Sequence, residues 1–209
     1  MAADRTGAPP RAWQRMLSGR RLDLLDPAPG DVAIEDIAHG LARVSRWNGQ
    51  TVGAHAFSVA QHALVVDDIA CGLDAAWGPR WQLATLLPDA AEYVIGDLIS
   101  PFKAAIGLDY KSFELRLLGA IHVRFGLPAN LPDAMTSHIK AADGIAAYYE
   151  ATRLAGFEIA EARSFFGAPP LLPASLQSGL DSLAALPAAE VQRSFLIRFG
   201  ALAVACDLK

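Results

Sequence analysis

The sequence has little that would suit an oxidising compartment or a membrane. Only two cysteines, Cys71 and Cys206, occur in 209 residues, and neither belongs to a C-x-x-C or C-x-x-H pattern. This spacing predicts neither a disulfide framework nor a zinc motif, and we expect both to be small buried hydrophobic side chains. No run of 18 or more apolar residues lacks a charge, and the N-terminus has no apolar signal core. The sequence therefore predicts a cytoplasmic protein that does not enter a membrane.

Positive charge is also scarce. Lys and Arg number 18 against 22 Asp and Glu, which gives a net charge of −4. A protein that coats nucleic acid needs clustered Lys and Arg to displace counterions, so we expect no nucleic-acid partner. Hydrophobic residues make up 53% of the chain and charged residues only 19%. This balance leaves apolar surface for a partner subunit, and we expect a homo-oligomer, namely a dimer.

No long β-branched stretch alternates apolar and polar residues, whereas several segments repeat apolar residues at spacings of three and four. The pattern predicts an all-α fold, with a disordered tail over residues 1–10 and a single domain over residues 11–209. The expected helices are 10–17, 31–47, 56–73, 78–93, 110–126, 133–156 and 188–208. Asp31 and Ser58 are candidate N-caps, Pro79 suits a first turn, and Gly19 would close the first helix. Residues 95–108 and 165–176, which contain Gly and Pro, are expected to form loops.

Three apolar helices each carry a polar residue that could bind a metal. His62 lies on the most apolar helix of the N-terminal half, Asp89 on the next, and Asp143 near the centre of a third. A buried carboxylate costs free energy unless it is paired or bound to a metal, so three such residues suggest a shared site. The ordinary alternative is an exposed position or a local salt bridge for each.

Four runs of the sequence, in this order, resemble a known family: "SRWNGQT", "FSVAQHALVV", "LLPDAAEYVIGDLISPFK" and "IKAADGIAAYYEA". They resemble the HD-domain metal-dependent phosphohydrolases, in particular the branch similar to the YfbR-like 5′-deoxynucleotidases. The resemblance covers residues 34–155 and implies a single HD-type helical bundle. It also implies one divalent metal ion on His62, Asp89 and Asp143, and hydrolysis of a nucleotide, specifically a deoxynucleoside 5′-monophosphate.

Position 88 departs from the family pattern, because Pro88 stands where the histidine of the HD pair belongs. Proline offers no ligand, so three groups remain for an ion that could be Mn²⁺, Co²⁺, Fe²⁺, Ni²⁺, Zn²⁺ or Mg²⁺. Three protein ligands plus water suffice in many catalytic zinc sites, although we expect weaker binding here. Pro88 should also end or bend its helix at Leu87. Gly144 is a second departure, since in the family a basic residue commonly follows the last aspartate, here Asp143. His55 could substitute for the ligand that is missing at position 88.

The resemblance assigns further roles to Glu92, Asp97 and Arg46, and the positions of Trp47 and Lys103 suggest two more. Glu92 and Asp97 would be catalytic acids or bases, Arg46 and Lys103 would bind the substrate phosphate, and Trp47 would stack on a base or sugar. The ordinary alternatives are a solvated helix-end acid, a helix cap, an exposed lysine and a tryptophan in the core. Three functions stay open: an active phosphohydrolase, a catalytically inactive HD-fold protein that binds a nucleotide or partner, and a purely structural helical dimer.

Overall fold

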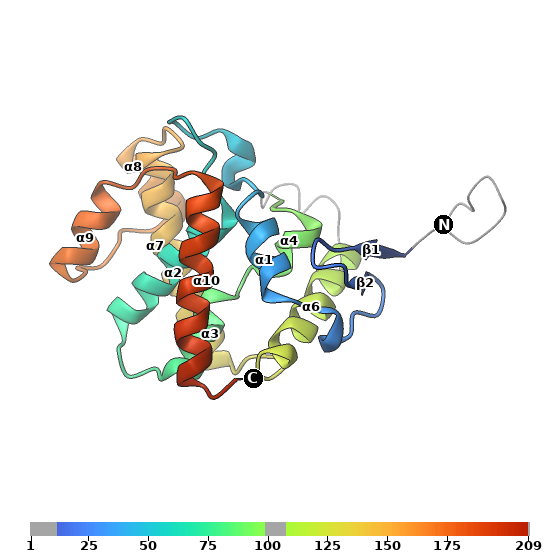
Figure 1. The fold of residues 1–209 in the computed structure, drawn as a ribbon. Helices are drawn as coiled ribbons and strands as arrows, with labels where there is room; N and C mark the ends of the chain where they lie inside the picture. Colours follow the sequence, from blue (N-terminus) through green and yellow to red (C-terminus); the bar gives the residue numbers. More distant parts are fainter. Residues whose placement is uncertain (1–11, 99–107, 209) are drawn as a thin grey trace.

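A computed structural model describes residues 12–98 and 108–208 and shows a helical bundle with a small two-stranded sheet at one side (Figure 1). The helices are α1 (Ile34–Leu41), α2 (Val59–Leu73), α3 (Pro79–Leu86), α4 (Glu92–Ile95), α6 (Leu108–Arg124), α7 (Asp133–Arg153), α8 (Ile159–Phe166), α9 (Ala174–Asp181) and α10 (Ala188–Ala205). Two short 3₁₀ helices are η1 (Pro29–Asp31) and η2 (Arg46–Gly49), and the strands are β1 (Trp13–Arg15) and β2 (Arg21–Asp23). The predicted all-α, single-domain fold is confirmed. The predicted disordered tail over residues 1–10 lies outside the described residues.

Helix α2 is the centre of the bundle. It packs against α3, α7 and α10, and its residues contribute to both hydrophobic clusters that the described residues form. Val59 and Ala63 belong to the cluster shared with α1, α3 and α10, whereas Val66 and Ile69 belong to the cluster shared with α7. Because α2 is buried on both sides, a polar residue in its first turns lies in the protein interior. His62 is such a residue.

Several local predictions agree with the structure. The Ser58 hydroxyl accepts a hydrogen bond of 3.3 Å from the backbone N–H of Gln61 and so caps α2. Pro79 is in the first turn of α3, where its missing N–H leaves no bond unmade. Helices α7 and α10 begin at Asp133 and Ala188, as the sequence indicates. Both helices are long, and the apolar residues that repeat along their sequences are the ones that the fold buries.

The predicted helix over residues 10–17 is wrong. Trp13–Arg15 instead forms an antiparallel pair with Arg21–Asp23, and Gly19 turns the chain with a φ of +85° rather than closing a helix. Leu22 is fully buried and fixes the hairpin on the bundle. The segment is too short for helical propensity to outweigh this contact.

Three further expectations need correction. The helix predicted from Asp31 begins at Ile34 and ends at Leu41, because Asp31 belongs to η1 and the chain turns again at η2. The segments that form α8 and α9 were not predicted as helices. Cys71 and Cys206 are half-buried rather than buried, and neither forms a disulfide.

Pro88 lies just after a helix, as its chemistry predicts. Helix α3 ends at Leu86, and Leu87 has left helical geometry with φ −113° and ψ 17°. Pro88 and Asp89 form the turn into α4, where the Asp89 carbonyl accepts a 2.9 Å hydrogen bond from the N–H of Glu92. The proline therefore lies outside both helices, and the turn sets the position of Asp89.

Helices α1 and α4 approach closely at Gly40. A Cβ atom at Gly40 would lie 2.8 Å from Cβ and 2.9 Å from the carbonyl oxygen of Tyr93. The neighbour of Tyr93 is Glu92, which is buried in the first turn of α4. The glycine thus permits the helix approach that places α4 beside the site.

We expect Gly40→Ala to lower the free energy of unfolding by about 2 kcal/mol, because the added methyl group forces α1 and α4 apart. Gly179→Ala in α9 is the matched control, since a Cβ there meets nothing within 4 Å. That control should raise stability by up to about 1 kcal/mol through helix propensity. Urea denaturation of both variants measures the difference, and equal effects would contradict the close approach.

Candidate functional site

The structure brings His62, Asp89 and Asp143 together from three separate elements. His62 is in the first turns of α2, Asp89 is in the turn after α3, and Asp143 is at the middle of α7. The His62 Nε2 atom lies 3.1 Å from Asp143 Oδ1 and 3.3 Å from Asp89 Oδ2. The imidazole is fully buried, whereas the two carboxylates are partly open to solvent. The partly exposed carboxylates of Asp89 and Asp143 therefore lie between the buried Nε2 atom of His62 and the solvent.

The Nε2 atom of His62 is close to these carboxylates without bonding well to either. Both oxygens are within ion-pair distance, yet Nε2 is a buried atom that makes no hydrogen bond of acceptable direction. Proximity gives electrostatic attraction, but a hydrogen bond also needs alignment of the N–H group. A buried nitrogen between two carboxylates in this state fits a position facing a shared cation.

The other ring nitrogen of His62 is held by a residue that the sequence analysis missed. Oε1 of Glu150 lies 2.5 Å from His62 Nδ1, and the Glu150 side chain is fully buried. Glu150 follows Asp143 by seven residues on α7, which places both on one side of that helix. This spacing, at the end of the run "IKAADGIAAYYEA", is the signal that could have revealed it.

Glu150 also holds Arg46 and Trp47. Its Oε2 atom accepts a 2.9 Å hydrogen bond from Trp47 Nε1 and bonds of 3.3 and 3.4 Å from Arg46 Nη2 and Nε. The third guanidinium nitrogen, Nη1, lies 3.7 Å from Asp97 Oδ2. One edge of the Arg46 fork is thus used within the protein, and the Nη1 side faces Asp97.

The chain around Arg46 is fixed at both ends. The N–H of Arg46 donates to the carbonyl of Phe57, and the N–H of Val59 donates to the carbonyl of Val44, so the segment is tied to the start of α2. Trp47 and Asn48 have φ values of 56° and 51°, a left-handed conformation that is uncommon for a bulky side chain. Strained backbone of this kind gathers at functional sites, where surrounding contacts enforce it.

The Trp47 ring is packed against two phenylalanines. Its centroid lies 5.6 Å from that of Phe157 and 6.1 Å from that of Phe166, both in edge contacts. Together with its hydrogen bond to Glu150, these contacts favour a role in positioning the segment. The stacking of Trp47 on a substrate stays a prediction.

Neighbouring charges shift the pKa values of His62 and Glu150. Burial and the Arg46 guanidinium oppose a charge on His62, but the carboxylates of Glu150, Asp143 and Asp89 outweigh them and raise its pKa well above the usual range. Burial opposes ionisation of Glu150 as well, yet His62 and Arg46 lower its pKa to about 2. Both shifts favour the charged forms, so Glu150 and His62 attract one another as a buried ion pair.

The cluster has an excess of negative charge. The carboxylates of Glu150, Asp89, Asp97 and Asp143 all act on Arg46, whose pKa is raised by them despite its burial. Four carboxylates against this guanidinium and one imidazolium leave a net charge of −2, and a neutral imidazole leaves −3. Such a cluster favours a cation beside it.

Among residues 12–98 and 108–208, no three His, Cys, Asp or Glu side chains form a metal site as they stand. His62, Asp89 and Asp143 nevertheless fit an ion in their chemistry. One imidazole nitrogen and two carboxylates form a donor set that divalent ions accept, and the His62 Nε2 atom is near both carboxylates. Asp89 and Asp143, with exposed fractions of 30% and 48%, have room to turn toward an ion.

Four other residues were predicted to belong to the site or to replace its missing ligand, namely Glu92, Asp97, Lys103 and His55. Glu92 is buried at the start of α4, three residues after Asp89. Asp97 contacts Arg46 through the pair given above. Lys103 lies outside the described residues. His55 is exposed, so the structure does not bring it to the position that Pro88 leaves without a ligand.

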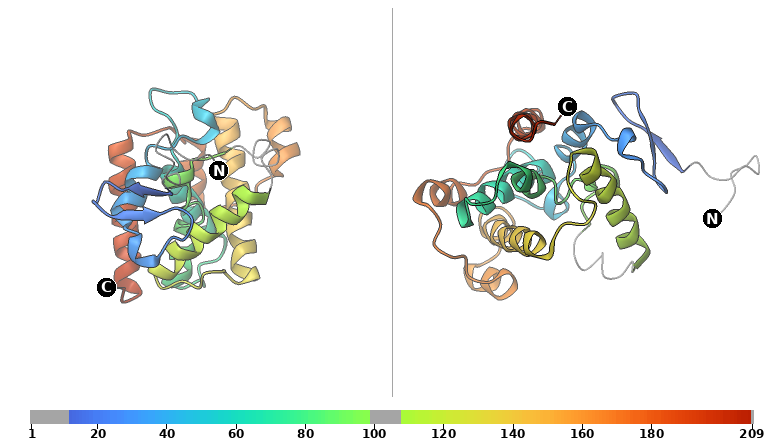
Figure 2. Two further views of the ribbon diagram at one scale, coloured as in Figure 1. Left: turned by 90° about the vertical axis from the view of Figure 1, so that its right-hand side faces the viewer. Right: turned by 90° about the horizontal axis from the view of Figure 1, so that it is seen from below.

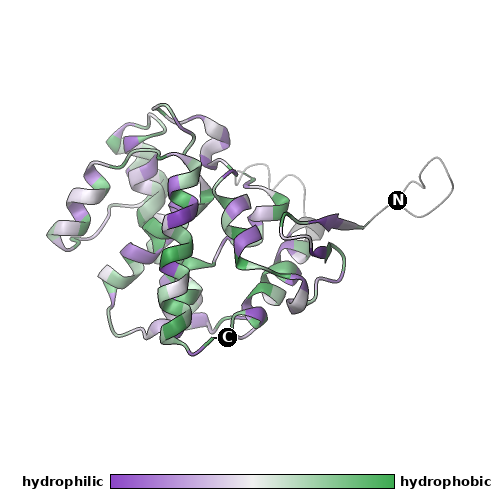
Figure 3. Ribbon diagram, viewed as in Figure 1, coloured by the Kyte–Doolittle hydropathy of each residue, from purple (hydrophilic) through white to green (hydrophobic). Residues whose placement is uncertain are grey.

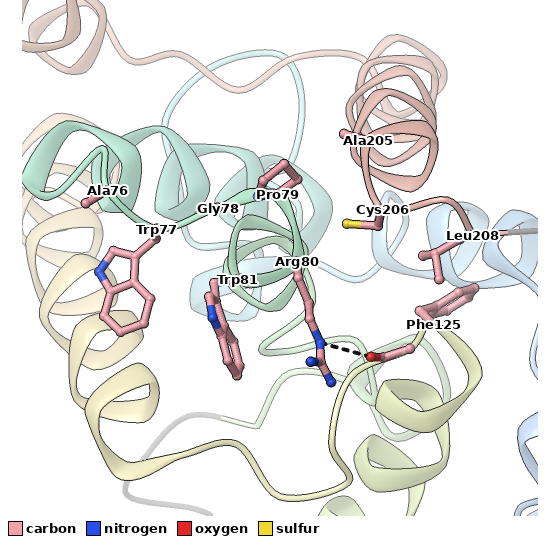
Figure 4. Close-up of a pocket in the computed structure, with 11 residues that line it drawn as sticks. Ala76, Trp77, Gly78, Pro79, Arg80, Trp81, Phe125, Ala205, Cys206 and Leu208 are labelled. Atoms are coloured by element: carbon pink, nitrogen blue, oxygen red, sulfur yellow. Dashed lines mark hydrogen bonds between the residues drawn. The ribbon is translucent and has the colours of Figure 1, made fainter.

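Two hollows in the described surface lie apart from the cluster. One, of about 520 Å³, is at the other end of α2 and is lined by Trp77, Trp81, Phe125 and Cys206, with Arg80 donating to the Gly126 carbonyl at its side (Figure 4). The second, of about 420 Å³, lies under the hairpin, between Met16 and Tyr93. Neither includes a residue of the candidate site. The cluster rather than either hollow concentrates the groups able to perform chemistry.

Comparison with known proteins identifies a relative of nearly the same length. The uncharacterized protein RCAP_rcc00048 of Rhodobacter capsulatus is 54% identical over 189 residues, which are 90% of this chain and 94% of the relative. The chain belongs to the family of that protein. No family model matches the chain. Within the described residues, every helix is too short or too polar to cross a membrane.

We expect Glu150→Gln to lower the free energy of unfolding of the metal-free protein by about 3 kcal/mol, because it leaves a buried charge without its partner. The His62 contribution is present below about pH 6.5 and is lost as the pH rises through the raised pKa. The Glu150 contribution is present above about pH 4.5 and is lost as the pH falls through about 2. The loss caused by the variant should therefore be largest between about pH 4.5 and 6.5.

Urea denaturation from pH 4 to 9 in the presence of EDTA measures this profile. Glu161→Gln, which changes an exposed carboxylate of α8, is the control and should show no such maximum. A stability difference that is constant over the whole range would contradict the buried ion pair.

Proposed function

We propose that the chain is a metal-dependent phosphohydrolase that acts on a nucleotide, with a deoxynucleoside 5′-monophosphate as the substrate. The observation that supports this most is the convergence of His62 Nε2 with the carboxylates of Asp89 and Asp143 beside the buried Arg46. The order of sequence motifs that resembles the HD-domain family leads to the same three residues. We further propose a cytoplasmic location.

His62, Asp89 and Asp143 would hold one divalent ion. One nitrogen and two carboxylates form a mixed set, and without a second imidazole at position 88 the set favours Mg²⁺ or Mn²⁺ over Co²⁺, Fe²⁺, Ni²⁺ and Zn²⁺. A bound ion supplies positive charge to a phosphoryl oxygen and lowers the pKa of a bound water. The contact of His62 Nδ1 with Glu150 fixes the imidazole ring and would leave Nε2 available to the ion, as in other metal sites where a carboxylate orients the histidine.

Charge balance explains why this chemistry needs the ion. A phosphate monoester is itself anionic and would be repelled by a cluster whose net charge is −2 or −3. A divalent cation held by this cluster would reduce its net charge to 0 or −1 and would supply positive charge at the point where the ester binds. Arg46 then contributes through Nη1, the guanidinium nitrogen that Glu150 does not use.

Acid and base roles fall to Glu92 and Asp97. Glu92 is buried one helical turn after Asp89, and Asp97 lies beside Arg46, where the phosphate would be held. A carboxylate in either position would accept a proton from the attacking water or donate one to the leaving oxygen. Lys103 and Trp47 would complete the substrate contacts.

A second candidate is nucleotide binding without turnover. Pro88 supplies no ligand, and Arg46 is already held by Glu150 and Asp97. A site of this kind would bind a nucleotide together with a weakly held ion and would not turn it over.

One experiment separates the two. Metal content of the purified protein is measured, followed by nucleotide binding and phosphate release from ribo- and deoxynucleotides with Mn²⁺, Mg²⁺ or Co²⁺ added. Turnover that His62→Gln abolishes, and that His55→Gln at an exposed position leaves intact, supports the hydrolase. Nucleotide binding without turnover supports the second candidate. Absence of metal binding, nucleotide binding and turnover would overturn both.

We expect Pro88→His to raise affinity for Mn²⁺ or Co²⁺ by at least about tenfold, since a restored first ligand should exceed the effect of an outer-shell partner. Isothermal titration calorimetry measures the change. Pro79→Ala, which alters a proline in the first turn of α3 away from the cluster, is the control and should leave metal affinity unchanged. An unchanged affinity in Pro88→His would show that position 88 no longer faces the ion.

A further inference from the structure

The hollow under the hairpin, of about 420 Å³, is lined by the hairpin on one side and by α1 and α4 on the other. Strands β1 and β2 lie over the side of the bundle that α1 and α4 form (Figure 1 and the left view of Figure 2). Met16 and Leu17 of the hairpin turn and Tyr93 of α4 give the hollow apolar walls. Its volume is within the range of small-molecule sites.

The hydroxyl of Tyr93 is buried and has no hydrogen-bond partner among residues 12–98 and 108–208. The residue as a whole is only 9% exposed. Buried polar atoms are bonded in the large majority of cases, since an unbonded one costs free energy. Tyr93 lines the hollow, so a molecule that occupies the hollow can bond to this hydroxyl.

The Tyr93 hydroxyl is a donor at neutral pH. Burial, and then the carboxylates of Asp36 and Asp31, raise the pKa of Tyr93 above its usual range. The hydroxyl therefore keeps its proton and can donate it to an oxygen of a ligand.

The other charged side chains of the lining also favour a ligand that accepts hydrogen bonds. Asp36 is already occupied, because its Oδ1 and Oδ2 atoms accept bonds of 2.8 and 2.6 Å from the N–H and the hydroxyl of Ser18. Arg15 donates from Nη1 to the Gly19 carbonyl, which uses one of its several N–H donors. Figure 3 shows β1, the strand that carries Arg15, as mainly hydrophilic.

We infer that this hollow binds a small organic carboxylate. The Tyr93 hydroxyl donates to the carboxylate, Arg15 supplies the opposite charge, and the apolar part of the ligand lies against Met16 and Leu17. A carboxylate suits these groups because it only accepts hydrogen bonds and is attracted by a guanidinium, whereas an amine would bring further donors. This inference does not depend on the proposed function.

Three probes with the same ring and different charges test the ligand class, namely benzoate, benzyl alcohol and benzylamine. We expect benzoate to bind with a Kd of about 1 mM, and the neutral and cationic probes to bind at least about tenfold more weakly. Two-dimensional NMR of the isotopically labelled full chain measures each affinity. The amides that shift should be those of the hairpin, α1 and α4.

Tyr93→Phe removes the hydroxyl and keeps the ring. It should lower benzoate affinity by at least about tenfold, because a hydrogen bond to a charged group is lost. It should not lower the stability of the ligand-free protein, because the hydroxyl has no partner to lose. Tyr149→Phe is the matched control, since that hydroxyl donates a 3.0 Å bond to Gln177 outside the hollow. The control should lower stability and leave benzoate affinity unchanged.

Arg15→Gln tests the charge. It should weaken benzoate binding by at least about threefold and leave benzyl alcohol binding unchanged, since only the carboxylate is attracted by the guanidinium. Arg21→Gln is the control, because Arg21 belongs to the same hairpin but lies over the Trp13 ring and does not line the hollow.

Four results would overturn the inference. They are no binding of any probe at about 10 mM, equal affinity for the three probes, benzoate affinity that Tyr93→Phe leaves intact, and a loss of stability in Tyr93→Phe as large as that in Tyr149→Phe. The last result would mean that the Tyr93 hydroxyl already has a partner in the folded protein, such as an ordered water.

Discussion

The contact between Glu150 and His62 decides how the candidate site is built, because it fixes the imidazole from its buried side. Glu150 is fully buried, and such a carboxylate is tolerated only when its oxygens are bonded. Its two oxygens are shared among His62, Trp47 and Arg46, which come from α2 and the segment before it. One side chain of α7 thus aligns both the candidate metal ligand and the candidate phosphate ligand.

This arrangement links the strained segment to the chemistry. The left-handed backbone at Trp47 is unfavourable by itself, and the indole bond to Glu150 and the contacts with Phe157 and Phe166 hold it in place. Arg46 is the preceding residue, so its direction depends on the same contacts. Phe157 and Phe166 therefore support the site through Trp47, although neither side chain is ionisable.

The sequence predicts those helices whose apolar periodicity matches their burial in the fold. It does not predict features that depend on contacts between distant parts of the chain. The long helices α2, α7 and α10 follow their apolar periodicity, and His62, Asp89 and Asp143 stood out because they interrupt it. The hairpin was missed because its strands have three residues each and gain their stability from Leu22 in the core. Glu150 was missed because its partners are 88 to 104 residues away, a proximity that only the folded chain creates.

The location of Pro88 affects how such a chain can change over generations. The residue lies in the turn between α3 and α4, outside the helical hydrogen bonds. Because the position lies outside both helices, we expect that an exchange between histidine and proline there would leave α3 and α4 intact. Under the proposed function, one substitution at this position would therefore change the number of metal ligands, while the Glu150 network remains in place.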